Sequence, residues 1–89
     1  MTLTIEKFLM ASFKQPDGDS MPGIDWMVRI NDVSSQFVIV RTYLESSPLS
    51  EKDRVELGDA VLNFLKRKIE LGWRPSTASG VLEMTEPLR

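Results

Sequence analysis

Residues 50 to 75 carry a full set of signals for one long amphipathic helix, and this segment limits the folds open to the chain. Ser50 can cap the first turn with its hydroxyl, and with Asp53 it forms a Ser-x-x-Asp pattern typical of helix starts. Gly72 favours the left-handed conformation that ends a helix, and Pro75 prevents the helix from continuing. The sequence therefore predicts a helix over residues 51–71.

This predicted helix has one apolar and one polar face. The apolar stripe consists of Leu57, Val61, Leu62, Phe64, Leu65 and Ile69, and the polar stripe consists of Lys52, Glu56, Asp59, Asn63, Lys66 and Glu70. We therefore expect one buried face and one solvated face. Gly58 costs up to about 1 kcal/mol relative to alanine inside a helix, so we expect it to mark close packing against a strand.

A β-hairpin is predicted over residues 24–44. Residues 24–30 alternate apolar and polar side chains with a period of two, which indicates a half-buried strand with Trp26 facing the core. Residues 37–44 are dense in β-branched and aromatic side chains, and turn-forming residues separate the two runs. The register stays open by one residue, and one register would pair Trp26 with Arg41 and lay the guanidinium over the indole.

The N-terminal segment fits two kinds of element. Residues 3–14 are compatible with a short helix or a strand, and Thr4 as a cap with Glu6 in the first turn favours the helix. Residues 16–23 include two prolines and two glycines, which predicts a loop.

These elements predict a single α+β domain over residues 1–75. It is a small two-layer sandwich in which the 51–71 helix packs on one face of an antiparallel sheet built around the 24–44 hairpin, because the two apolar faces must bury each other. Residues 76–89 are flexible in composition, and a short edge strand is possible at 81–85.

The residue types present exclude several kinds of chemistry. The chain has no histidine and no cysteine, so it lacks the residues for Ser-His or Cys-His catalysis, zinc fingers and disulfides. Asp17 begins an apparent calcium loop, but Pro22 and Val28 stand where such a loop needs glycine and glutamate. Glu56 and Asp59 belong to the solvated helix face. We therefore expect no enzyme, no cofactor and no metal; a carboxylate- or lysine-dependent enzyme is the alternative, and it requires a deep cleft.

Four residues are candidates for binding a protein partner. Trp73 either folds back onto the last helical turn or, with Arg74, forms an exposed anchor of the kind enriched at interfaces. Met27 and Met21 can add an adaptable apolar patch, because thioethers repack readily around a partner.

One basic cluster is a candidate for binding an anion. It consists of Lys66, Arg67 and Lys68 at the end of the predicted helix. The helix dipole accounts for positive charge at this position, and an anionic partner is the second explanation.

The sequence as a whole predicts a small cytoplasmic protein-binding or regulatory module. It would act through a protein–protein interface, with an unidentified protein or a second copy of the chain as its partner. The alternative is a nucleic-acid-associated protein that uses the basic end of the 51–71 helix, although the formal net charge of −2 speaks against it. We expect no signal peptide and no membrane span, because no basic leader or long apolar run is present.

Overall fold

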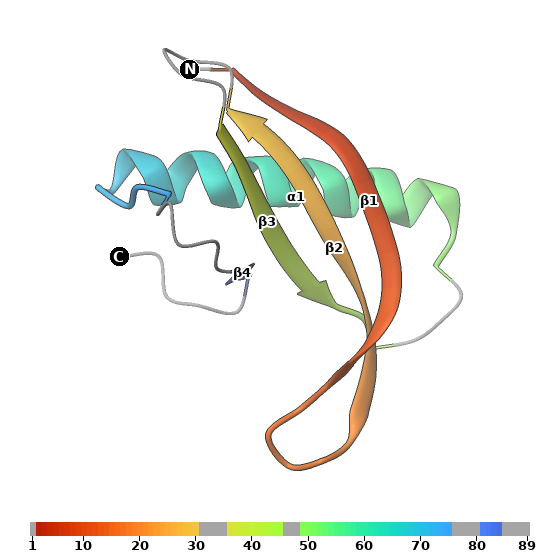
Figure 1. Cartoon of the computed structure of the whole chain (residues 1–89). Coiled ribbons are helices and arrows are strands. Elements are labelled where there is room, and N and C mark those ends of the chain that lie inside the picture. The colour runs from red at the N-terminus through yellow and green to blue at the C-terminus, as the bar shows by residue number, and fades with distance from the viewer. Residues whose placement is uncertain (1, 31–35, 46–48, 76–80, 85–89) are drawn as a thin grey trace.

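The computed structural model describes residues 2–30, 36–45, 49–75 and 81–84, and in these ranges one helix packs on a four-stranded mixed sheet (Figure 1). The elements are β1 (Leu3–Lys14), β2 (Ser20–Ile30), β3 (Gln36–Tyr43), α1 (Glu51–Glu70) and β4 (Val81–Glu83). The sheet order is β1-β2-β3-β4. The predicted two-layer α+β fold is confirmed.

The sheet is mixed, whereas the sequence predicts an antiparallel one. β1, β2 and β3 pair antiparallel, but β4 pairs parallel with β3. The physical reason is the crossover through α1, because a strand that returns to the sheet after a helix can lie parallel to the strand before that helix. β4 lies within the range 81–85 in which an edge strand is expected.

The predicted start and end signals of the helix are confirmed. The Ser50 hydroxyl accepts a hydrogen bond of 3.1 Å from the backbone N–H of Asp53. The helix ends at Glu70, Leu71 caps it, and Gly72 follows with a φ of 107°. Positive φ is costly for residues with a Cβ, so glycine is the residue that suits this position.

The β2–β3 hairpin is confirmed, and its register decides the question that the sequence left open. Trp26 lies opposite Val40, and Arg41 lies opposite Asp25. The predicted stacking of Arg41 on Trp26 is therefore wrong. Paired residues share a face of the sheet, so this register places Arg41 on the face opposite to the buried Trp26.

The N-terminal segment is a strand, so the favoured short helix over residues 3–14 is wrong. An extra residue in β1 explains the ambiguity, since Ile5 pairs with Val28 but Lys7 pairs with Met27. This β-bulge turns both Ile5 and Phe8 towards the core, three residues apart, which imitates helical spacing. The pairing with β2 then determines the strand.

The loop after β1 is shorter than the predicted range of 16–23, because β2 already begins at Ser20. Gly18 has a φ of 95°, and the Asp17 side chain accepts a 2.9 Å hydrogen bond from the N–H of Asp19. The backbone N–H of Gln15 donates to the carbonyl of Asp19 at 2.7 Å and closes the turn. Asp17 therefore has the role of a polar turn residue.

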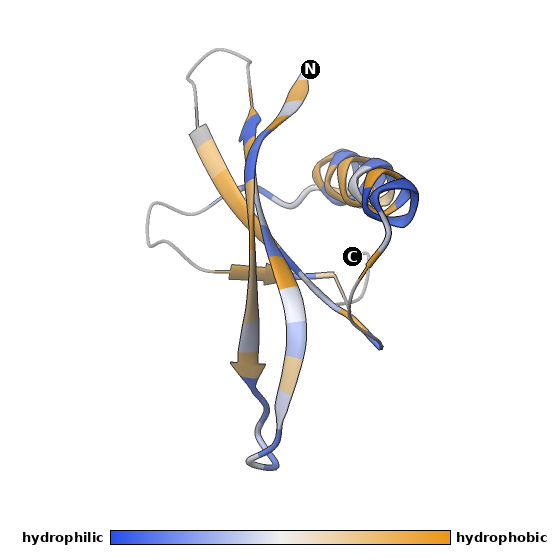
Figure 2. Cartoon of the chain, turned by 90° about the vertical axis from the view of Figure 1, so that its right-hand side faces the viewer, coloured by the Kyte–Doolittle hydropathy of each residue, from blue (hydrophilic) through white to orange (hydrophobic). Residues whose placement is uncertain are grey.

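The core lies between α1 and one face of the sheet (Figure 2). Trp26 is its largest fully buried side chain, and the indole N–H donates to the Thr42 hydroxyl at 2.9 Å. A Cβ on Gly58 would lie 3.2 Å from the Trp26 ring and 3.3 Å from Ile5, so glycine lets the helix approach the sheet closely, as expected.

Candidate functional site

The sheet face that points away from α1 in Figure 2 is here called the helix-free face. The strand register places apolar and charged residues on it. Its larger residues are Glu6, Lys7, Leu9, Phe13, Met21, Asp25, Met27, Arg29, Phe37, Ile39, Arg41, Tyr43, Val81 and Glu83. No segment in the described ranges covers this face. Leu9, Phe37 and Val81 are 56%, 48% and 38% exposed, which is high for large apolar side chains.

Two arginines on this face lie over phenylalanine rings. The guanidinium carbon of Arg41 is 3.8 Å from the centre of the Phe13 ring, and that of Arg29 is 4.2 Å from the centre of the Phe37 ring. Stacking of this kind is attractive because the cation meets the negative face of the ring. Arg29 of β2 thereby contacts the neighbouring strand β3, and Arg41 of β3 reaches across β2 to contact β1.

Each of these arginines also has a carboxylate partner. Arg41 binds Asp25 through two hydrogen bonds, with Nε–Oδ1 and Nη2–Oδ2 distances of 2.7 and 2.9 Å, and Arg29 pairs with Glu6. The hydrogen bond to Asp25 raises the pKa of Arg41 above its ordinary value, so this side chain stays charged at any physiological pH. The charges of these two arginines are therefore compensated within the face.

Phe13 belongs to an ordered aromatic cluster at one end of the face. Its ring meets the ring of Tyr43 edge-on, with centres 6.2 Å apart, and the Tyr43 hydroxyl donates to Glu83 at 3.0 Å. A Cβ on Gly23 would lie 2.8 Å from the Phe13 ring and 2.7 Å from the Thr42 carbonyl. Glycine at this position therefore allows Phe13 to lie flat on β2.

The structure separates the four predicted partner-binding residues into two groups. Met27 and Met21 are half-buried on the helix-free face, where they pair with Ile39 and Phe13. Trp73 instead packs against the core near the end of α1.

Arg74 lies next to Trp73 and is also remote from the methionines. Its Nη1 donates to the carbonyls of Ile69 and Trp73 at 2.9 and 2.8 Å, so it caps the helix C-terminus. The structure therefore does not unite Trp73 and Arg74 with Met27 and Met21 in one surface.

The predicted anion-binding cluster is also divided. Lys66 and Arg67 are exposed, whereas Lys68 is 4% exposed and faces the core. The three side chains therefore do not form one continuous basic surface, and anion binding by these residues stays a prediction.

The observed stacks were not predicted from the sequence, which offered Trp26 as the only ring for Arg41 and no ring for Arg29. Strand alternation assigns Asp25, Met27 and Arg29 to one face of β2. The ring that each arginine meets depends on the pairing of different strands, and no spacing within one strand carries that information.

Within the described residues, no cluster of acidic side chains could hold a metal ion. In the same part of the chain, no helix has the length and apolar character needed to cross a membrane. The chain matches no protein-family model, no curated protein and no solved structure.

Proposed function

We propose that this protein is a non-catalytic protein-binding module and that the helix-free face is its interface. The observation that supports this most directly is the exposure of Leu9, Phe37 and Val81 on a face that no described segment covers. Aromatic residues, methionine and arginine are enriched at protein interfaces. Their arrangement here, with stacked and ion-paired arginines, reduces the side-chain entropy lost on binding.

A second copy of the chain is the partner that this face fits best. Its charged side chains are balanced, with three basic and three acidic groups: Lys7, Arg29, Arg41, Glu6, Asp25 and Glu83. Two such faces can meet without net repulsion, as a two-fold symmetric interface requires. The same balance disfavours nucleic acid, which needs an excess of positive charge.

The size of the face also suits a dimer. The strands have 12, 11, 8 and 3 residues, and at about 3.3 Å per residue and about 4.8 Å between strands they cover on the order of 500 Å² in projection. Stable interfaces bury about 800 Å² of accessible surface per partner, and accessible surface exceeds projected area on a face with protruding side chains. Two sheets packed face to face would form a sandwich with a layer spacing of about 10 Å.

Sedimentation equilibrium tests this proposal directly. We expect the wild-type chain to dimerise between about 1 and about 500 μM, the range typical of interfaces of modest size. Met27→Glu places an additional charge in the middle of the face and should yield a folded monomer. Asn63→Glu, on the exposed face of α1, is the matched control and should leave the dimer intact. A wild-type monomer throughout this range, or a Met27→Glu dimer of unchanged strength, refutes the proposal.

A further inference from the structure

We propose that a groove between β1 and α1 binds an extended peptide, which adds to the sheet as a strand beside β1 and places an acidic side chain on Arg54. This surface lies at the sheet edge, so the proposal goes beyond the interface described above and does not depend on it. The ligand class is a linear protein segment in which an acidic and an apolar residue stand two positions apart.

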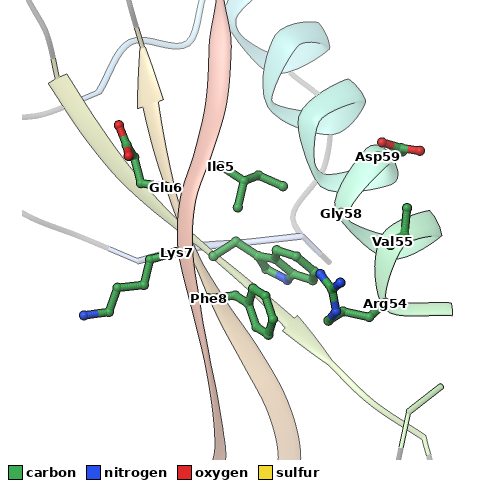
Figure 3. Close-up of a pocket in the computed structure, with 9 residues that line it drawn as sticks. Ile5, Glu6, Lys7, Phe8, Arg54, Val55, Gly58 and Asp59 are labelled. Carbon is green, nitrogen blue, oxygen red and sulfur yellow. The ribbon is translucent and has the colours of Figure 1, made fainter. Parts of the chain in front are cut away.

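The groove has an apolar floor and one helical wall. It is a pocket of about 640 Å³ whose floor is formed by Ile5, Phe8 and Trp26, and its wall is formed by Val55 and Gly58 (Figure 3). Phe8 is half-buried and lies on the fully buried Trp26, with the two ring centres 5.5 Å apart, so Phe8 is the aromatic ring that the groove presents. A branched apolar side chain is the group that such a surface accommodates.

The bulge in β1 shapes the groove. Figure 3 shows Ile5 and Phe8 pointing towards α1. The side chains of Glu6 and Lys7 point away from the helix, and Glu6 pairs with Arg29 on the helix-free face. The floor of the groove therefore remains apolar although two charged residues interrupt the strand.

The strand beside the groove has an available edge. β1 is the first strand in the sheet order, and among the described strands only β2 pairs with it. An edge strand presents backbone N–H and C=O groups to which an incoming strand can bond. From Lys7 to Lys14 the pairing with β2 is regular, so the outward N–H and C=O groups of this part of β1 recur at the regular spacing that an added strand needs.

Arg54 and Asp59 are the charged residues of α1 that line the groove, and of the two only the Arg54 side chain points towards β1 (Figure 3). Its guanidinium carbon lies 4.7 Å from the centre of the Phe8 ring, at the mouth of the groove. Its acidic neighbour is Glu51, at 4.0 Å between Nη2 and Oε1, and the Glu51 side chain is 88% exposed. Such a long, solvated contact is weak, so a peptide carboxylate can displace it and form a shorter charge-assisted bond.

The spacing in the ligand follows from strand geometry. Successive side chains of a strand point to opposite faces, so residues two apart point to the same face. A peptide beside β1 can therefore direct an apolar side chain onto Phe8 and an acidic side chain to Arg54 only if the two stand at i and i+2.

A single peptide strand fits this edge better than the β1 strand of a second copy. The N-terminal end of α1 projects past β1 on the core side of the sheet (Figure 1). In a β1–β1 dimer the two-fold axis is perpendicular to the sheet, so both projecting helix ends would meet over the same seam. A peptide has no helix and avoids this conflict.

The proposal is tested by selecting ligands from a phage-displayed library of random peptides of about twelve residues, long enough to span the regular part of β1. The strongest peptide is then synthesised and titrated into isotope-labelled protein, with backbone amide shifts as the readout. We expect enriched sequences with an acidic residue two positions from an apolar one. Their shifts should fall on residues 5–10 and 54–59.

Two matched variants test the role of the cation. Arg54→Gln should lower the affinity for the selected peptide on the order of tenfold, because it removes a charge-assisted hydrogen bond. Arg67→Gln removes the same charge from the far end of α1, where the side chain is exposed, and should leave the affinity unchanged. Neither variant lies on the helix-free face, so both should dimerise like the wild type.

Four results would overturn the proposal. The first is a library that yields no enriched peptide, and the second is a peptide affinity that Arg54→Gln leaves intact. The third is a set of peptide-induced shifts that fall on the helix-free face. The fourth is a concentration-dependent shift of the β1 edge amides without peptide, which would identify a second copy as the occupant. Met27→Glu separates this proposal from the dimer, since that variant should lose the dimer and keep the peptide.

Discussion

Gly58 is the point of closest approach between α1 and the sheet, and replacing it with alanine tests the packing described above. The added methyl would lie 3.2 Å from Cζ3 of Trp26 and 3.3 Å from Cδ1 of Ile5, closer than ordinary contacts of 3.4–4 Å. The Trp26 ring is buried and its N–H is bonded to Thr42, so a shift of the ring away from the methyl meets the surrounding core and strains that bond. Ile5 presents a terminal methyl group, which can rotate.

Two opposing effects determine how much Gly58→Ala changes the free energy of unfolding. Alanine gains about 1 kcal/mol of helix propensity over glycine, whereas overpacking a core costs about 1–3 kcal/mol. Because the core resists a shift of the Trp26 ring, we expect the cost towards the upper end, about 2–3 kcal/mol. The net destabilisation is then about 1–2 kcal/mol, or a fall in melting temperature of about 10 °C for a domain of this size.

Thermal and urea unfolding followed by circular dichroism measure this change. Asn63→Ala is the control, because it improves propensity on the exposed face of the same helix and should raise stability by about 0.5 kcal/mol. Ile5→Val removes the methyl at 3.3 Å, so the double variant with Gly58→Ala should be less destabilised than the sum of the single variants by about 0.5–1 kcal/mol. If Gly58→Ala stabilises the protein as Asn63→Ala does, the close approach to Trp26 is wrong.

Two further predictions concern the core. Thr42→Val removes the hydroxyl that accepts the Trp26 indole N–H, so the free energy of unfolding should fall by about 1–3 kcal/mol; equal stability in urea titrations would show that the indole finds another partner. Trp73→Ala removes a half-buried ring that packs against the core, and calorimetry should show a loss of about 2 kcal/mol, near 10 °C, with dimerisation unchanged. A melting temperature within a few degrees of wild type, together with a weaker dimer, would instead support the exposed-anchor interpretation of Trp73.

The helix could be predicted from the sequence almost residue by residue, because its signals are local. The cap at Ser50, the glycine after the last turn and the three- and four-residue spacing all act between residues close in the chain. Strand alternation likewise predicted that Trp26 is buried and that Met27 faces the other way. These features do not depend on which strand lies beside which.

The sequence could not decide between a helix and a strand over residues 3–14, and the bulge is the reason. One extra residue at Glu6 breaks the alternation that identifies a strand, and the resulting spacing of Ile5 and Phe8 resembles a helix. A bulge is defined by the partner strand, which lies about twenty residues away in the sequence. Local patterns therefore point to the wrong element here.

The sequence by itself determined the helix, the hairpin strands, the two-layer α+β class and the absence of histidine and cysteine chemistry. The tertiary structure decided the surfaces that the proposals use: Arg41 over Phe13, the edge position of β1, and the groove beside Arg54. The physical reason is the distance along the chain over which each interaction acts. Propensity, capping and alternation act over a few residues, whereas a stacked pair, a sheet edge and a groove exist only once strand register and helix docking bring distant residues together.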